Sequence, residues 1–117
     1  MVKDEVKDLT VKIVLEHLKT KECLIFLFGS QLNPSVLKGS DIDVGLLCEG
    51  KIDDHKLALI KNELEEKART LRKIDIIDFR KVDDKVFLEN ALGRINIWHQ
   101  TPRSKTFLTS LMKPSNV

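Results

Sequence analysis

The sequence predicts an α/β fold, of the α+β type, in which amphipathic helices and short strands alternate around one sheet. Short apolar runs occupy residues 23–28, 41–48 and 73–79, and their length is typical of strands. Apolar residues recur at steps of three or four over residues 3–20 and 53–71, which is typical of helices laid on a sheet. With 117 residues, 42% of them hydrophobic, the chain has the size of a single domain.

The first expected strand, Cys23 to Phe28, contains no polar residue, as is typical of a strand covered on both faces. Gly29 follows at once, and a glycine can adopt backbone angles and a close approach that a side chain would forbid. Ser30 then offers a hydroxyl and an N–H at a position where a helix can begin. This sequence of strand, glycine and serine suits the binding of a phosphate group.

The second expected strand carries two carboxylates, Asp41 and Asp43, between the apolar residues Ile42 and Val44. Because side chains alternate along a strand, both carboxylates leave the same face, with their Cα atoms about 7 Å apart. Like charges beside buried apolar residues need a cation or hydrogen-bond donors. Mg²⁺ prefers such hard oxygen ligands, completed by waters and substrate phosphates, so the stretch predicts a site for a metal ion and a nucleotide.

Residues 53–71 are expected to form a helix of about five turns that begins at Asp53 and Asp54. Its inward positions are predicted to be Leu57, Ile60, Leu64, Ala68 and Leu71. The third strand, 73–79, carries Asp75 and Asp78 at an odd spacing. Only one of these two can therefore share a face with Asp41 and Asp43.

The last third of the chain contains a short helix, expected over 83–91, that turns Val86 and Phe87 inward, with Leu88 as a third candidate, and ends at Gly93. Residues 95–98 form either a final strand or an apolar cover. The tail, 101–117, either adds a short helix or is ordered by a partner.

The net charge, the longest apolar run and the positions of the cysteines bear on the partner and the compartment of the protein. The net charge is only +2, so a nucleic-acid partner is not expected. No apolar run is long enough for a signal peptide or a membrane span. Cys23 and Cys48 lie in apolar strands without a CxxC pair, which predicts two reduced core thiols in a cytoplasmic protein.

Gly29-Ser30, ten further residues and Asp41-Ile42-Asp43 together resemble the GS-x10-DxD signature of the polymerase-beta-like nucleotidyltransferase superfamily, in particular its minimal branch. The resemblance covers about residues 20–98 of a single domain, 1–117. It implies the nucleotidyltransferase fold, a small mixed β-sheet with helices packed mainly on one face. The family's third carboxylate lies in an apolar-Asp-apolar strand, so Asp75 is preferred and Asp78 is the alternative.

The resemblance also implies a magnesium-dependent transfer of a nucleoside monophosphate, AMP from ATP, to an acceptor hydroxyl. Asp41, Asp43 and Asp75 would be the catalytic and metal-binding residues, for one or two Mg²⁺ ions, and Gly29 and Ser30 would bind the nucleotide's phosphates. In the minimal branch the partner is typically a helical HEPN toxin. The expected role is therefore an antitoxin that adenylylates a tyrosine of such a toxin.

Other functions remain open at this point. Family members often carry an arginine and a glycine shortly after the Gly-Ser pair, and residues 31–38 contain neither. A non-catalytic antitoxin of the same fold, acting by contact alone, is one alternative. A subunit of a small-molecule, antibiotic-type nucleotidyltransferase is another, and self-association into a homo-oligomer is compatible with each.

Overall fold

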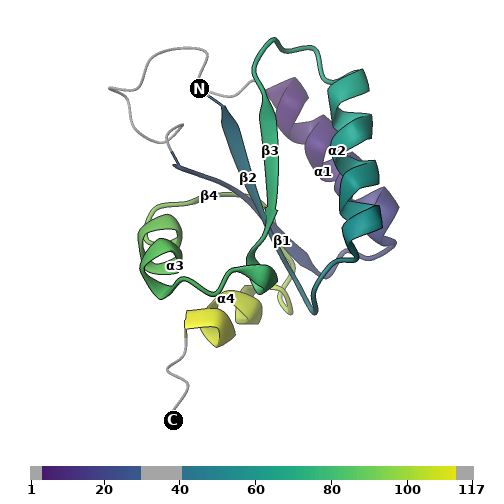
Figure 1. The fold of residues 1–117 in the computed structure, drawn as a ribbon. Helices are drawn as coiled ribbons and strands as arrows, with labels where there is room; N and C mark the ends of the chain where they lie inside the picture. The colour runs from purple at the N-terminus through teal and green to yellow at the C-terminus, as the bar shows by residue number, and fades with distance from the viewer. Residues whose placement is uncertain (1–3, 30–40, 113–117) are drawn as a thin grey trace.

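The structure, a computed structural model, describes residues 4–29 and 41–112. Helices and strands follow one another along the chain as the sequence predicts (Figure 1). In chain order they are α1 (Asp4–Leu18), β1 (Cys23–Phe28), β2 (Ile42–Cys48), α2 (Asp54–Lys67), β3 (Ile74–Asp78), the 3-10 turn η2 (Phe79–Lys81), α3 (Lys85–Leu92), β4 (Asn96–His99) and α4 (Lys105–Met112).

The four strands form one mixed sheet in the order β3-β2-β1-β4. β1 is antiparallel to both β2 and β4, whereas β2 and β3 are parallel. A parallel pair needs a crossover connection, and α2 supplies it between β2 and β3. The mixed sheet expected from the sequence is therefore confirmed, and residues 95–98 contribute to a final strand rather than to a cover.

Helices cover both faces of the sheet, which explains why every residue of β1 is buried. One apolar cluster joins α1 and α2 to alternate residues of the strands, including Ile25 and Val44. The second joins α3 and α4 to the opposite face, through Phe26, Phe28 and Leu47. Figure 1 shows the two long helices side by side on one face and the two short helices on the other.

α2 is shorter than predicted. Its start is capped by Asp53, whose carboxylate accepts a hydrogen bond from the Lys56 N–H, but the helix ends at Lys67. Ala68 adopts an extended conformation and closes the last turn through its N–H to the Leu64 carbonyl. The prediction that Leu71 lies on the buried face is wrong, because the chain has left the helix there and the side chain is fully exposed.

α3 begins at Lys85, two residues later than predicted, and ends at Leu92. Asp84 is the cap, accepting hydrogen bonds from the N–H groups of Val86 and Phe87, and Gly93 ends the helix. Leu88 and Ala91 are the buried residues. The prediction that Val86 points inward is wrong, since it stands in the first turn on the solvent side and Phe87 is only partly covered.

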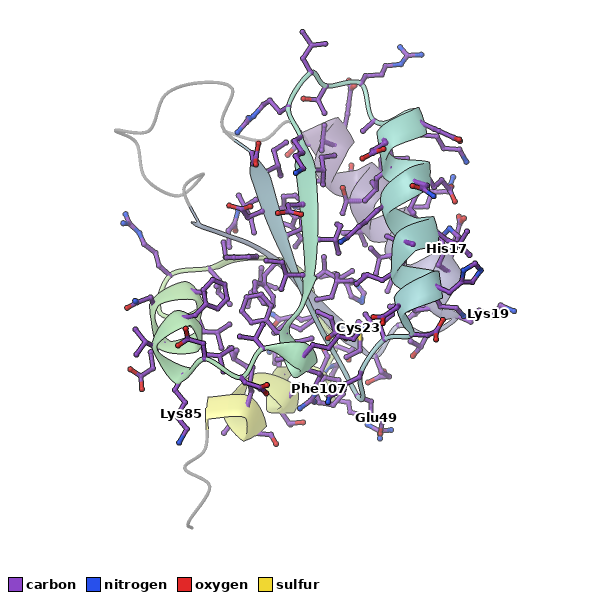
Figure 2. All side chains as sticks on the ribbon, viewed as in Figure 1. His17, Lys19, Cys23, Glu49, Lys85 and Phe107 are labelled. Carbon is purple, nitrogen blue, oxygen red and sulfur yellow. A yellow bond between two sulfur atoms is a disulfide. The ribbon has the colours of Figure 1, made fainter. Side chains whose placement is uncertain are left out.

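Cys23 and Cys48 form a disulfide, so the prediction of two reduced thiols is wrong. They are direct partners in the antiparallel register of β1 and β2, with their Cα atoms 4.2 Å apart. Their separation of 25 residues hides this contact in the sequence. Cys23 is labelled in Figure 2, and the pair lies at the opposite end of β1 from Phe28 and Gly29. The compartment inferred from reduced thiols loses that support.

The beginning of the C-terminal tail packs against the domain. α4 inserts Phe107 into the second apolar cluster, and the guanidinium of Arg80 lies 5.4 Å from the centre of that ring. The turn before α4 is closed by reciprocal hydrogen bonds between Thr101 and Ser104. Within the described ranges, no helix has both the length and the apolar character needed to cross a bilayer.

Candidate active site

Gly29 directly follows β1 and lies beside the carboxylate of Asp43 in β2. Its φ of +81° lies in the left-handed region, which residues with a side chain rarely adopt. A Cβ atom at this position would also lie 2.5 Å from the Oδ2 atom of Asp43. Both the conformation and the close approach therefore require glycine.

Ser30, predicted to bind phosphate together with Gly29, lies outside the described residues, as do residues 31–40. The structure describes the two sides that flank this segment. Before it, β1 ends at Phe28 and is followed by Gly29. After it, Asp41 directly precedes β2, which begins at Ile42.

Asp43 and Asp75 are direct partners in the parallel register of β2 and β3. Phe28 of β1 opposes Asp43 on the other side, so the three residues form a row across neighbouring strands. Partners in register leave the same face of a sheet, and here it is the face covered by α3 and α4. Asp41 lies two residues before Asp43, so it shares this face, and it is exposed. Asp41, Asp43 and Asp75 are called the aspartate row below.

The carboxylates of this row act on one another electrostatically. Partial burial raises the pKa of Asp43 above its ordinary value, and the negative charges of Asp75 and Asp41 raise that pKa further. The fold thus brings all three predicted aspartates into one electrostatic group. A bound cation would relieve the repulsion, because it favours the ionised form of each carboxylate.

Asp78 lies on the opposite face and has a different task. Its side chain is 3% exposed and accepts hydrogen bonds from the N–H of Ile52, at 2.7 Å, and from the N–H of Arg80, at 3.0 Å. Both carboxylate oxygens are thus used to hold the start of η2 and the segment before α2. The geometry favours Asp75 over Asp78 as companion of Asp43, and the catalytic role of Asp75 stays a prediction.

The donor set fits Mg²⁺ in type, since all three side chains offer carboxylate oxygens. They do not form a complete cage, because nowhere in residues 4–29 and 41–112 do three His, Cys, Asp or Glu side chains converge closely enough to hold a metal ion. An ion bound here would need oxygens from a substrate or water as well. This is the usual way in which proteins bind Mg²⁺ with one or two carboxylates and phosphate groups.

A cavity of about 420 Å³ opens beside Asp43 and Gly29. β3, α3 and Arg94, which follows the C-cap residue Gly93 of α3, also line this cavity. The lining residues are Phe28, Gly29, Asp43, Ile77, Phe87, Asn90, Ala91 and Arg94. Sequence reasoning missed the contribution of α3, because no motif connects residues 87–94 to the glycine and aspartates some fifty residues earlier.

Comparison with known proteins agrees with this arrangement. The family model described as polymerase beta, nucleotidyltransferase matches residues 11–102. A search among curated proteins found no sequence that matches the chain.

Solved structures of toxin-antitoxin complexes share the fold. A chain of MntA-HpeT, in a variant with two aspartates replaced by glutamate, is 18% identical, with a TM-score of 0.71 over 91% of this chain and 83% of that one. A toxin-antitoxin complex with AMP-PNP gives 19% and 0.63, over 87% and 83%. The tri-AMPylated Shewanella oneidensis HEPN toxin with its MNT antitoxin gives 18% and 0.60, over 91% and 83%. At these identities the likeness establishes the fold.

The family match extends from α1 to the segment after β4 and includes the row of aspartates and the glycine beside it. The chain therefore belongs to the polymerase beta nucleotidyltransferase family.

Proposed function

We propose that this protein is a magnesium-dependent nucleotidyltransferase that transfers AMP from ATP to a hydroxyl group of a partner protein, a tyrosine of a HEPN-type toxin, and so acts as its antitoxin. One observation carries the proposal. Asp43 and Asp75 are paired across parallel strands, with Asp41 in the same electrostatic group and Gly29 in contact with Asp43.

In this reaction the protein positions the two substrates and stabilises the charge of the phosphates, and it forms no covalent intermediate. The acceptor oxygen forms a bond to the α-phosphorus, the bond from that phosphorus to the bridging oxygen of the β-phosphate breaks, and pyrophosphate leaves. Asp75 accepts the proton of the acceptor hydroxyl or helps to hold a second ion. Gly29 and Ser30 would bind the β- and γ-phosphates through their backbone N–H groups and the Ser30 hydroxyl.

Asp41 and Asp43 would hold Mg²⁺ together with oxygens of water and of the substrate phosphates, and Asp75 would join them where a second ion binds. The ion supplies neutralisation of the phosphate charge when it is bound. Burial raises the pKa of Asp43, and without a cation the charges of Asp75 and Asp41 raise it further. With a cation, the same carboxylates orient the triphosphate relative to the acceptor.

The partner and the donor are supported by the structural neighbours. One of them was solved with AMP-PNP, and another contains a HEPN toxin in tri-AMPylated form. In a third, two aspartates that lie two positions apart in its chain were replaced by glutamate, the same spacing as Asp41 and Asp43. We infer the same classes of donor and acceptor for this chain, and a cytoplasmic setting in which ATP is present.

The test is a transfer assay with the small helical protein that copurifies with this chain from its native source. With MgATP, the wild type is expected to add about 329 Da per AMP to a tyrosine of that protein, as phosphoryl transfer to a hydroxyl requires. Asp43→Asn is expected to abolish the mass shift. Asp8→Asn, an exposed acidic residue on α1, is the matched control and should transfer at the wild-type rate.

Two outcomes would contradict the proposal. If Asp43→Asn transfers AMP as fast as the wild type, the aspartates are not the catalytic group. If no partner acquires AMP and the Asp43→Asn protein still neutralises the toxin, the chain acts by contact alone.

A further inference from the structure

The cavity beside Asp43 has an aromatic wall that the catalytic aspartates do not explain. Phe79 is completely buried, whereas Phe87 on α3 keeps 36% of its surface exposed. The Phe87 ring is nevertheless held in place, with its centre 6.1 Å from that of Phe28 and 5.9 Å from that of Phe79. The ring is thus fixed from behind and remains accessible from the cavity, as a stacking surface requires.

Polar groups stand on the same side of α3. Asn90 follows Phe87 by three residues, about one turn of the helix, and lines the same cavity. Arg94 comes directly after the C-cap residue Gly93 and lines the same cavity as Gly29 and Asp43. Among the residues that the structure describes, Arg94 forms no ion pair.

One cavity therefore combines an accessible aromatic ring, an amide, a cation and a carboxylate. Its volume of about 420 Å³ lies within the range of small-molecule sites. A tyrosine acceptor would use the ring but would bring no anionic group for Arg94 to bind. A nucleoside triphosphate uses both, since its base is planar and its phosphates are anionic.

We propose that this cavity is the nucleoside half of the active site, in which Phe87 stacks on the base, Asn90 hydrogen-bonds to the edge of the base and Arg94 binds a phosphate. The inference rests on the function proposed above and extends it. Arg94 then supplies, from the C-terminal side of α3, a phosphate-binding cation in a chain that has no arginine between residues 29 and 41.

Calorimetric titration of the whole protein with AMP-PNP and with tripolyphosphate, both in Mg²⁺, separates the base from the phosphates. Phe87→Leu keeps apolar bulk but removes the aromatic face, and is expected to weaken AMP-PNP binding roughly tenfold while tripolyphosphate binding is unchanged. Phe87→Trp should bind AMP-PNP at least as well as the wild type. Arg94→Ala is expected to weaken both ligands roughly tenfold, since it removes a charge-assisted contact to phosphate.

Control variants come from the same helix. Val86→Ala and Lys85→Ala are exposed neighbours that do not line the cavity, and each should change either affinity by less than about twofold. Asn90→Ala should reduce the preference between ATP and GTP, because the edge of the base is then no longer read.

The outcomes distinguish this inference from the proposed function. A wild-type protein that transfers AMP and binds AMP-PNP, with Phe87→Leu and Arg94→Ala equally tight, overturns the inference alone. If Phe87→Leu raises only the KM for the protein acceptor, the ring belongs to the acceptor site and the inference is wrong. A wild-type protein that binds neither ligand overturns both.

Discussion

The backbone of Gly29 lies so close to the carboxylate of Asp43 that no side chain can stand between them: a Cβ on Gly29 would be 2.5 Å from Asp43 Oδ2. This contact joins the end of β1, where the triphosphate is expected, to Asp43 of β2, one of the carboxylates proposed to bind Mg²⁺. The two residues that the sequence signature separates by a loop are thus neighbours in space.

Gly29→Ala is therefore expected to damage both the fold and the site. The left-handed φ and the clash should lower the free energy of unfolding by about 1–3 kcal/mol and shift Asp43, so AMP transfer should be lost. Gly50→Ala is the matched control, because a Cβ on Gly50 meets nothing within 4 Å. Denaturant titration and the transfer assay measure both effects, and equal behaviour of the two variants would contradict the close contact.

The repulsion within the aspartate row predicts a pH-dependent stability. Burial and the charges of Asp75 and Asp41 hold the pKa of Asp43 in the folded protein above its ordinary value of 3.8. The folded state then binds the Asp43 proton more tightly than the unfolded state does, so ionisation of this group favours unfolding. The destabilisation is absent below pH 3.8, grows as pH rises and is complete above the folded-state pKa.

Asp43→Asn removes this effect. Without Mg²⁺, the variant should have a higher Tm than the wild type at pH 7, and the difference should shrink as pH falls and approach zero well below pH 3.8, where Asp43 is protonated in both states. Added Mg²⁺ should raise the Tm of the wild type more than that of the variant. Thermal scans over this pH range, with and without Mg²⁺, provide the measurement, and a Tm difference that does not change with pH would argue against the repulsion.

Asp75 and Asp78, three residues apart, should respond in opposite ways to the same substitution. Asp78→Ala leaves the buried N–H of Ile52 without its acceptor and should cost about 2–4 kcal/mol of stability. Asp75→Ala should leave the stability nearly unchanged and abolish AMP transfer. Chemical denaturation and the transfer assay, applied to both proteins, test the assignment of the third carboxylate. An Asp75→Ala protein that is strongly destabilised, but transfers AMP at the wild-type rate under conditions where it is folded, would contradict the assignment.

The disulfide between Cys23 and Cys48 is expected to stabilise the domain without serving the reaction. Closing a loop over a separation of 25 residues is worth roughly 3 kcal/mol in the chain-entropy model. Reductant should therefore lower the denaturation midpoint of the wild type, and the double variant Cys23→Ala, Cys48→Ala should be insensitive to it. Transfer by the reduced protein should persist at temperatures where it is folded, because the pair lies at the far end of β1 from Gly29. A wild-type midpoint unaffected by reductant would show that the bond is not formed.

The order of the strands and long helices, and the chemical groups of the motif, could be predicted from local patterns along the chain. An unbroken apolar run such as Cys23 to Phe28 favours a strand covered on both faces, and two aspartates at a spacing of two leave the same face of a strand. These are local properties, set by steric preference and by the period of the backbone. The family resemblance rested on the same local pattern.

Tertiary structure decided what depends on register and on the packing of distant segments. The pairing of β2 with β3 placed Asp75 beside Asp43 and turned Asp78 toward the backbone of Ile52, and the pairing of β1 with β2 brought Cys23 against Cys48. α3 likewise added Phe87 and Arg94 to the cavity only because it folds back over the sheet. Register and docking follow from burial summed over the whole chain, so no single stretch of sequence carries the signal for them.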